Sequence, residues 1–130
     1  MSAITAADAS RFRATLRQRA VALREEIRQT LLRSDEERYL TIAEQARDIE
    51  DDSFADLVVD VNLAEVDRDL AELRDIDMVL ERLAEGTYGR CDMCGEDIDR
   101  KRLEAQPTAI RCLACQSEFE RAPPQRTPGL

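Results

Sequence analysis

The sequence predicts a mainly α-helical protein: a long antiparallel two-helix coiled-coil hairpin, a small globular end held by four cysteines, and a short C-terminal helix. Two stripes of apolar residues recur at intervals of three or four, the spacing of one face of a helix. The chain has no Trp and 36% charged residues, which suits exposed helices better than a compact sheet. We therefore expect a hairpin over 1–85, a cysteine module over 86–121 and a disordered tail over 122–130.

The first arm is expected to run from Ser10 to about Asp48, because this stretch contains neither Pro nor Gly. The four residues from Ser34 to Glu37 have the form of a capping box, which allows a break there. Because nothing else ends the helix, we expect it to continue with Ser34 exposed. The stripe consists of Phe12, Leu16, Ala20, Leu23, Ile27 and Leu31, and continues more thinly with Tyr39, Ile42 and Ala46.

The second arm is expected to end at Gly86, a residue that readily takes the left-handed conformation after a helix. Neither arm can bury its stripe alone, so the two should pair as an antiparallel hairpin. Arms of about 30–36 residues would be roughly 45–55 Å long, with the turn near 48–56. The second stripe consists of Leu63, Val66, Leu70, Leu73, Ile76, Leu80 and Leu83.

The cysteines predict one structural zinc ion. Their spacing is Cys91-x2-Cys94-x17-Cys112-x2-Cys115, and Gly95 supplies a turn after the first pair. Four thiolates complete a tetrahedral shell and leave no position for water or substrate. The chain has no histidine, which excludes a mixed Cys/His site. Either CxxC pair taken alone is also compatible with a redox pair or with buried thiols.

The charge balance argues against binding to nucleic acid. The formal net charge is −9, and zinc with four thiolates would add about two more negative charges. Such a chain is repelled by phosphate backbones, so we expect protein partners and no sequence-specific DNA contact. The first residues lack a basic start and a continuous apolar segment, and no apolar run approaches 18 residues, so we expect neither a signal peptide nor a membrane span. Paired cysteines without a secretion signal fit metal binding in a reducing cytoplasm.

The expected turn, residues 48–56, is rich in carboxylates and is called the acidic segment below. It has two interpretations. In the first it is a solvated loop whose acids cap the next helix; in the second it is a negatively charged probe for a basic or metal-containing site. Composition alone does not separate them. The five acids are Asp48, Glu50, Asp51, Asp52 and Asp56.

Taken in order, these features resemble the DksA/TraR family of bacterial RNA polymerase regulators. The resemblance rests on residues 86–95 (GTYGRCDMCG), 98–109 (IDRKRLEAQPTA) and 112–115 (CLAC), and covers roughly residues 10–120. It implies that the hairpin enters the secondary channel of the polymerase and alters the stability of promoter complexes. No bond is made or broken, so we expect no enzymatic activity. Relative to the longest members, an N-terminal segment of the globular part is expected to be missing.

The resemblance also implies roles for individual residues. The family has an Asp-x-x-Asp-x-Ala pattern at the turn, which falls on Asp48, Asp51 and Ser53 here, with Ser in place of Ala. Arg68 and Arg102 fall on basic family positions and are possible polymerase contacts.

The family positions that favour a response to guanosine tetraphosphate are basic. Three of them are Asp75, Gln106 and Gln116 in this chain, so we expect a weak or absent response.

Two other functions remain open at this point. A zinc-ribbon adaptor could use the hairpin to bind a different protein, with the acidic segment merely solvated. A thiol enzyme could use one CxxC pair, although tight stoichiometric zinc would argue against it. For the polymerase regulator we expect one copy of the chain to act as a monomer.

Overall fold

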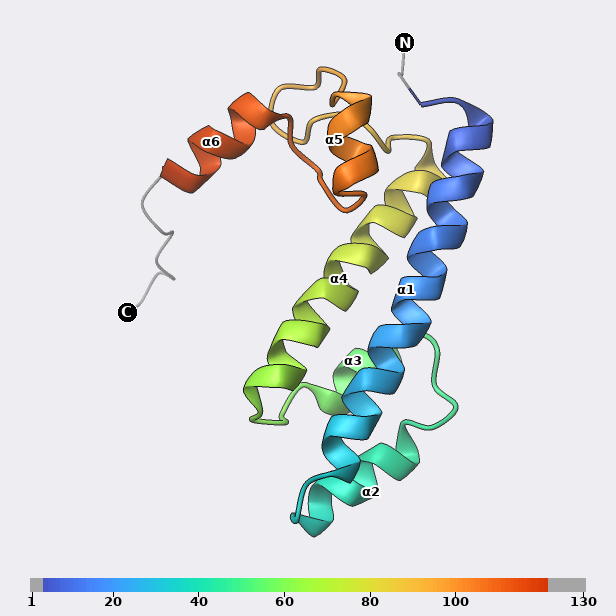
Figure 1. Ribbon diagram of the computed structural model, residues 1–130, viewed down its shortest axis with the longest axis vertical. Helices are drawn as coiled ribbons and strands as arrows, with labels where there is room; N and C mark the ends of the chain where they lie inside the picture. Colours follow the sequence, from blue (N-terminus) through green and yellow to red (C-terminus); the bar gives the residue numbers. More distant parts are fainter. Residues whose placement is uncertain (1–3, 122–130) are drawn as a thin grey trace.

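The computed structural model describes residues 4–121, and in this part of the chain it contains six helices (Figure 1). The tail over 122–130, which the sequence predicts to be disordered, lies outside the described residues. The helices are α1 (Ala6–Leu32), α2 (Glu37–Gln45), α3 (Ser53–Val58), α4 (Ala64–Glu85), α5 (Arg100–Ala105) and α6 (Leu113–Arg121).

Helices α1 and α4 run side by side in opposite directions and form the hairpin (Figure 1). All six members of the first apolar stripe are buried on α1, and they face a matching stripe on α4. Helix α4 ends at Gly86, whose φ of +78° is the left-handed conformation that the sequence predicts. The mainly helical fold class with a coiled-coil hairpin is therefore confirmed.

The prediction of a continuous first arm was wrong, because α1 ends at Leu32. The hydroxyl of Ser34 accepts a hydrogen bond from the backbone N–H of Glu36 at 3.1 Å, and Glu36 has an extended backbone. At heptad spacing the α1 stripe would continue through Ser34 and Arg38, which are polar. Apolar side chains resume one position later, at Tyr39, so the heptad spacing of the α1 stripe is not kept across residues 33–38.

The predicted position of the turn also differs from the structure. Arg33–Glu36 marks the distal end of the hairpin, and from there α2 returns along the flank of α1 (Figure 1). Residues 46–52 then lead to α3, which precedes the start of α4 at Ala64. The acidic segment consequently lies beside α1 and not at the distal end. This arrangement buries apolar residues of α2 and α3 in the core, namely Tyr39, Ala43, Phe54 and Val58.

The base of the hairpin, where α1 begins and α4 ends, carries the cysteine module. Ile98 and Leu103 of this module are buried in the same core as the hairpin. None of the residues of α6 is buried, and α6 projects away from the hairpin (Figure 1). Within residues 4–121, no helix is both long and apolar enough to cross a membrane.

Candidate metal centre, base groove and acidic segment

The structure brings all four predicted metal ligands together. One Sγ atom from each of the four cysteines lies within 4.8 Å of the other three, and the Sγ atoms of Cys94 and Cys112 are 3.9 Å apart. Tetrahedral zinc with Zn–S bonds of about 2.3 Å needs sulfur–sulfur distances of about 3.8 Å. The cluster is therefore within a small adjustment of the geometry that zinc requires.

Backbone hydrogen bonds shape the first knuckle. The N–H of Gly95 donates to the carbonyl of Cys91 at 3.0 Å, and the N–H of Cys91 donates to the carbonyl of Glu96 at 2.8 Å. Gly95 has a φ of +78°, a backbone conformation that residues with a Cβ rarely adopt. In the second knuckle the N–H of Cys115 points at the Sγ of Cys112, 3.5 Å away. Two tight turns thus aim four sulfurs at one point.

The four thiolates of the cluster need a bound cation to offset their mutual repulsion. Burial raises the pKa of Cys91, but backbone N–H groups, that of Cys112 first, outweigh it and lower that pKa to about 6. The neighbouring thiols, Cys112 first, raise the pKa of Cys115 to about 12. Four thiolates at this spacing repel one another unless a metal neutralises them. The four cysteines form the site of one structural Zn²⁺, with Cys91 the most deeply buried ligand.

An ion-pair network, which sequence reasoning missed, joins the module to α1. The guanidinium of Arg100 lies 2.6 Å from the buried carboxylate of Asp8, and Arg11 lies 2.7 Å from Glu104. Asp8 also accepts from the backbone N–H of Thr5, and this bond is the main reason that its pKa is lowered. The signal was present in the sequence, because Thr5-x-x-Asp8 is a capping-box pattern at the start of an apolar stripe.

Two further contacts attach the module to the rest of the base. Arg82 of α4 pairs with Asp92 of the first knuckle at 2.8 Å. The hydroxyl of Tyr88 donates to the carbonyl of Pro107 at 2.8 Å, and its ring packs against Phe12 with centroids 5.4 Å apart. The zinc module is therefore held against both arms of the hairpin.

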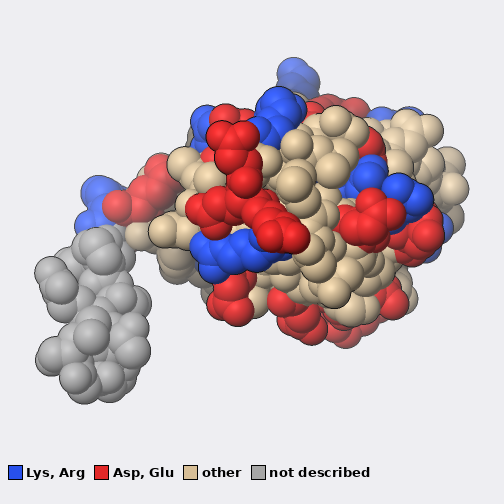
Figure 2. Space-filling model, turned by 90° about the horizontal axis from the view of Figure 1, so that it is seen from below, with Lys and Arg blue, Asp and Glu red and all other residues tan. Residues whose placement is uncertain are grey.

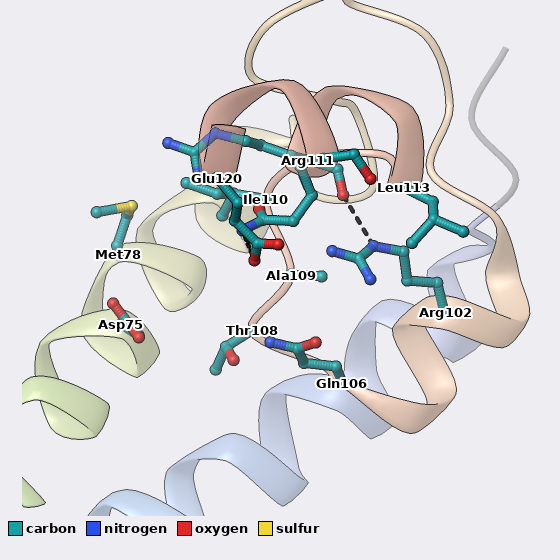
Figure 3. A pocket seen from close by; sticks show the side chains of 12 residues that line it. Asp75, Met78, Arg102, Gln106, Thr108, Ala109, Ile110, Arg111, Leu113 and Glu120 are labelled. Carbon is teal, nitrogen blue, oxygen red and sulfur yellow. Dashed lines mark hydrogen bonds between the residues drawn. The ribbon is translucent and has the colours of Figure 1, made fainter. Parts of the chain in front are cut away.

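A groove of about 350 Å³ lies between α4 and the module, and we call it the base groove. Four residues that the sequence singled out line it together: Asp75, Gln106, Gln116 and Arg102. Figure 3 shows three of them, Asp75, Gln106 and Arg102, around the groove. Arg102 donates from Nε to the carbonyl of Arg111 at 2.9 Å (Figure 3). The acidic lining residues Asp75 and Glu120 balance the charges of the two arginines.

Arg68, the other predicted contact residue, does not lie in the base groove. It is exposed on α4 and lines a shallow surface between α1 and α4 near the start of α4, together with Glu65 and Asp69. The structure therefore separates Arg68 from Arg102 and brings only Arg102 to the base.

The five carboxylates of the acidic segment are exposed, and all three of its predicted contact residues, Asp48, Asp51 and Ser53, face solvent. Asp51 accepts hydrogen bonds from both the hydroxyl and the backbone N–H of Ser53. The hydroxyl bond is the main cause that lowers the pKa of Asp51. Seen from the distal end, the molecule carries predominantly acidic side chains around an uncharged area (Figure 2).

The residues that lie beneath the acidic segment were not predicted from the sequence. Ile49 and Glu50 share a surface pocket with Arg24 of α1. The charge of Arg24 acts on Asp51 and also on Asp77 of α4. Burial raises the pKa of Asp77, and the nearby carboxylate of Asp52 raises it further.

Comparisons with known proteins agree with this architecture. Residues 86–121 match the family described as the prokaryotic dksA/traR C4-type zinc finger. Over 111 residues the chain is 32% identical to the RNA polymerase-binding transcription factor DksA of Caulobacter vibrioides, covering 81% of this chain and 73% of that protein. The DksA of Haemophilus influenzae is 41% identical over 54 residues, which is 42% of this chain and 37% of that protein.

A solved structure, that of the transcription factor DksA2 from Pseudomonas aeruginosa, matches with a TM-score of 0.58 at 28% sequence identity. The match covers 89% of this chain and 85% of that one. The matching segments span only 37–40% of the length of the relatives from Aquifex aeolicus, Haemophilus influenzae and Bacillus subtilis. The zinc-finger match and the Caulobacter alignment, which extends over hairpin and finger alike, establish that the chain belongs to the DksA/TraR family.

Proposed function

We propose that this protein is a transcription regulator of the cytoplasm that binds RNA polymerase directly and catalyses no reaction. The observation that carries the proposal is the alignment over 111 residues with a protein named as an RNA polymerase-binding transcription factor. The alignment covers 73% of that relative, so it is not confined to the zinc finger. The net charge of −9 favours a protein partner over nucleic acid, and we expect one copy of the chain to act without reading DNA sequence.

The part of the protein that acts on the polymerase is, in this proposal, the acidic segment. The hairpin enters the secondary channel, and Asp48 and Asp51 change the stability of promoter complexes there, with Ser53 beside them. Support comes from their exposure, since carboxylates facing solvent are available to a partner. Arg68 and Arg102 are the additional polymerase contacts that we propose.

We further propose that guanosine tetraphosphate has little or no effect on this regulator. A strongly anionic ligand needs charge-assisted hydrogen bonds from several basic groups. The base groove offers Arg102 and Arg111, but the Nε of Arg102 already donates to a backbone carbonyl and the guanidinium of Arg111 lies 3.8 Å from the centre of the Phe119 ring. Asp75 and Glu120 add repulsion.

Abortive transcription at a ribosomal promoter tests the function. Purified polymerase is assayed with the wild-type protein, with Asp48→Asn/Asp51→Asn, and with Asp60→Asn, an exposed acid outside the acidic segment. We expect the wild type and Asp60→Asn to change promoter output, and the double variant to lose the effect while still binding polymerase. Competition with a transcript-cleavage factor reports occupancy of the secondary channel.

Three outcomes would count against the proposal at different levels. If core polymerase does not retain the protein in a pull-down, the function is wrong and a different protein partner is indicated. Binding without competition against the cleavage factor would exclude the secondary channel. Full activity of the double variant would exclude the role of the acidic segment alone.

A further inference from the structure

The joint between α1 and α2 is built from residues that are able to form a helix. Residues 33–36 contain neither Gly nor Pro, and no residue from 10 to 48 is either. The interruption depends on the hydrogen bond from the Glu36 N–H to the Ser34 hydroxyl and on the extended backbone of Glu36, at φ −80° and ψ 123°. Rotation about a few backbone bonds would therefore join α1 and α2 into one helix.

Polar contacts, in addition to the burial of Tyr39 and Ala43, hold α2 in its folded-back position. The Nε of Arg28 on α1 donates to the carbonyl of Ala43 at 3.2 Å, in the last turn of α2, where helix carbonyls lack partners within the helix. The pocket that α1 shares with residues 46–50 is lined on the α1 side by Arg24, Glu25 and Arg28, and by Val21, which remains 56% exposed. The α1 side of this pocket is thus mostly polar, and the apolar contribution to the folded-back position comes from the buried side chains of α2 and α3.

The folded-back position also has an electrostatic cost. The Nε of Arg24 is buried without a hydrogen-bond partner among residues 4–121. The charged form of Asp77 is disfavoured mainly by its burial; Arg24 attracts Asp77 and offsets part of this cost, and the like charge of Asp52 adds a smaller repulsion. Moving the acidic segment away would return Arg24 to water and separate Asp52 from Asp77.

The chain has a second way to bury the same apolar residues. In the hairpin Arg13 hydrogen-bonds the carbonyl of Leu83, and Arg33 pairs with Glu65. Continuing this antiparallel register past the joint would bring position 39 opposite about 58, and position 43 opposite about 54. Those positions hold Tyr39, Val58, Ala43 and Phe54, which are all buried in the present arrangement. An extended hairpin would therefore keep an apolar seam.

We propose that residues 33–63 form a cap that alternates between the folded-back state and an extended state, in which α1 and α2 are one helix and the acidic segment is at the far end. In the folded-back state Asp48 and Asp51 lie beside α1, so they cannot reach a site deep inside a partner protein. RNA polymerase would select the extended state, and this part rests on the proposed function. In a two-state equilibrium a partner shifts the population only if it binds one state more tightly.

Two sets of variants bias the equilibrium in opposite directions. Glu37 is the first residue of α2, where Pro is tolerated, and Glu36 already has the extended backbone that a following Pro requires. Glu37→Pro therefore preserves the folded-back state but breaks a continuous helix, and Glu37→Ala is its matched control. Ser34→Ala/Asp35→Ala removes the side-chain bond at the joint and raises the helix propensity, which should increase the extended fraction about fivefold.

The measurement is a label-to-label distance between positions 17 and 50, using non-natural amino acids so that the cysteines remain available for zinc. Both positions are exposed, and position 17 lies one helical turn before Val21, which shares a pocket with Glu50. The folded-back state places the labels within roughly 20 Å. In the extended state the hairpin register places position 50 opposite about position 47, which is 30 helical steps from position 17, so the labels are about 45 Å apart.

We expect a short distance in the free wild type, a larger long-distance fraction in Ser34→Ala/Asp35→Ala, and a long distance when core polymerase is bound. Glu37→Pro should stay short throughout and lose its transcriptional effect. A long distance in the free wild type overturns the inference, as does a short distance in the polymerase complex. If polymerase does not bind at all, the proposed function fails, and the response of the free variants alone then decides whether the cap opens.

Discussion

The guanidinium of Arg100 lies 2.6 Å from the buried carboxylate of Asp8, so the start of α1 is fastened to α5 of the zinc module. Arg11 and Glu104 repeat this connection alongside, at 2.7 Å. The same Asp8 caps its own helix together with Thr5. One carboxylate therefore supports the end of the hairpin and its attachment to the finger.

Replacing Asp8 should make stability depend on pH in a defined direction. The hydrogen bond from the backbone N–H of Thr5, together with Arg100, lowers the pKa of Asp8 in the folded state. A carboxyl with a lowered pKa stabilises the fold above its unfolded pKa, and this contribution is lost as the pH falls through the folded pKa. We expect Asp8→Asn to lower the Tm at pH 7, and the gap to the wild type to close in acid. A gap of constant size across the titration would show that the charge of Asp8 is unimportant.

Removing a zinc ligand should unfold the finger while leaving the hairpin helical. Structural zinc contributes folding free energy on the order of 10 kcal/mol in small finger domains. We expect Cys91→Ser to lose bound zinc, while the helical signal of α1 and α4 persists because their seam lies outside the metal site. Metal content and circular dichroism provide the readouts. Met93→Ser, which alters an exposed side chain of the same knuckle, is the control and should retain one zinc.

Replacing Ser53 by Ala should free the Asp51 carboxylate. The hydroxyl of Ser53 is the main cause of the lowered pKa of Asp51, so Ser53→Ala should raise that pKa towards its ordinary value. Carbon-detected NMR titration of the side-chain carboxyl measures the change. If the proposed function holds, the variant should also affect promoter complexes more strongly than the wild type. Ser53→Thr keeps a hydroxyl and should leave the pKa lowered.

Neutralising Asp77 should stabilise the protein. Burial, with a smaller contribution from Asp52, raises the pKa of Asp77, so its charged form is disfavoured in the folded state. A raised carboxyl pKa costs stability at neutral pH, and the cost disappears as the pH falls below the folded pKa and then the unfolded pKa. For this partly exposed side chain we expect Asp77→Asn to add roughly 0.5 kcal/mol or less at pH 7, measured by urea unfolding. A loss of stability would mean that the attraction to Arg24 outweighs burial.

Introducing basic character into the base groove should create a response to guanosine tetraphosphate. Asp75→Asn/Gln116→Lys removes one repulsive charge and adds one attractive charge at the groove. We expect the polymerase complex with this variant to bind the labelled nucleotide at least about tenfold more tightly than the wild-type complex. Asp67→Asn/Gln45→Lys makes the same charge change at exposed positions outside the groove and should have no effect. A strong response of the wild-type complex would contradict the proposal.

The sequence was most informative where one local rule decided the structure. The α1 stripe from Phe12 to Leu31 is buried as its spacing predicts, and Gly86 ends α4 in the left-handed conformation. The zinc site followed from cysteine spacing alone, because tetrahedral coordination restricts how two CxxC turns can meet. In each case the residue types and their spacing are sufficient to predict the feature.

The sequence was least informative where two arrangements compete. Two contributions decide whether α1 continues beyond Leu32: the hydrogen bond to the Ser34 hydroxyl, which favours a break, and the helix propensity of the following residues, which favours continuation. The difference between their free energies is too small to be predicted from the sequence pattern. The place of the acidic segment depends on contacts such as Arg28 with Ala43, which join distant parts of the chain. Long-range pairs of this kind, including Asp8 with Arg100, produce no repeating pattern in the sequence from which they could be predicted.

The bend after Leu32 owes nothing to proline or glycine, and this has an evolutionary consequence. A joint made of ordinary side chains can be straightened or tightened by single amino-acid changes, without rebuilding either neighbouring helix. The length of the hairpin can therefore change by substitution alone. Related chains with the same zinc module could have hairpins that differ by several helical turns because of substitutions at Ser34 and its neighbours.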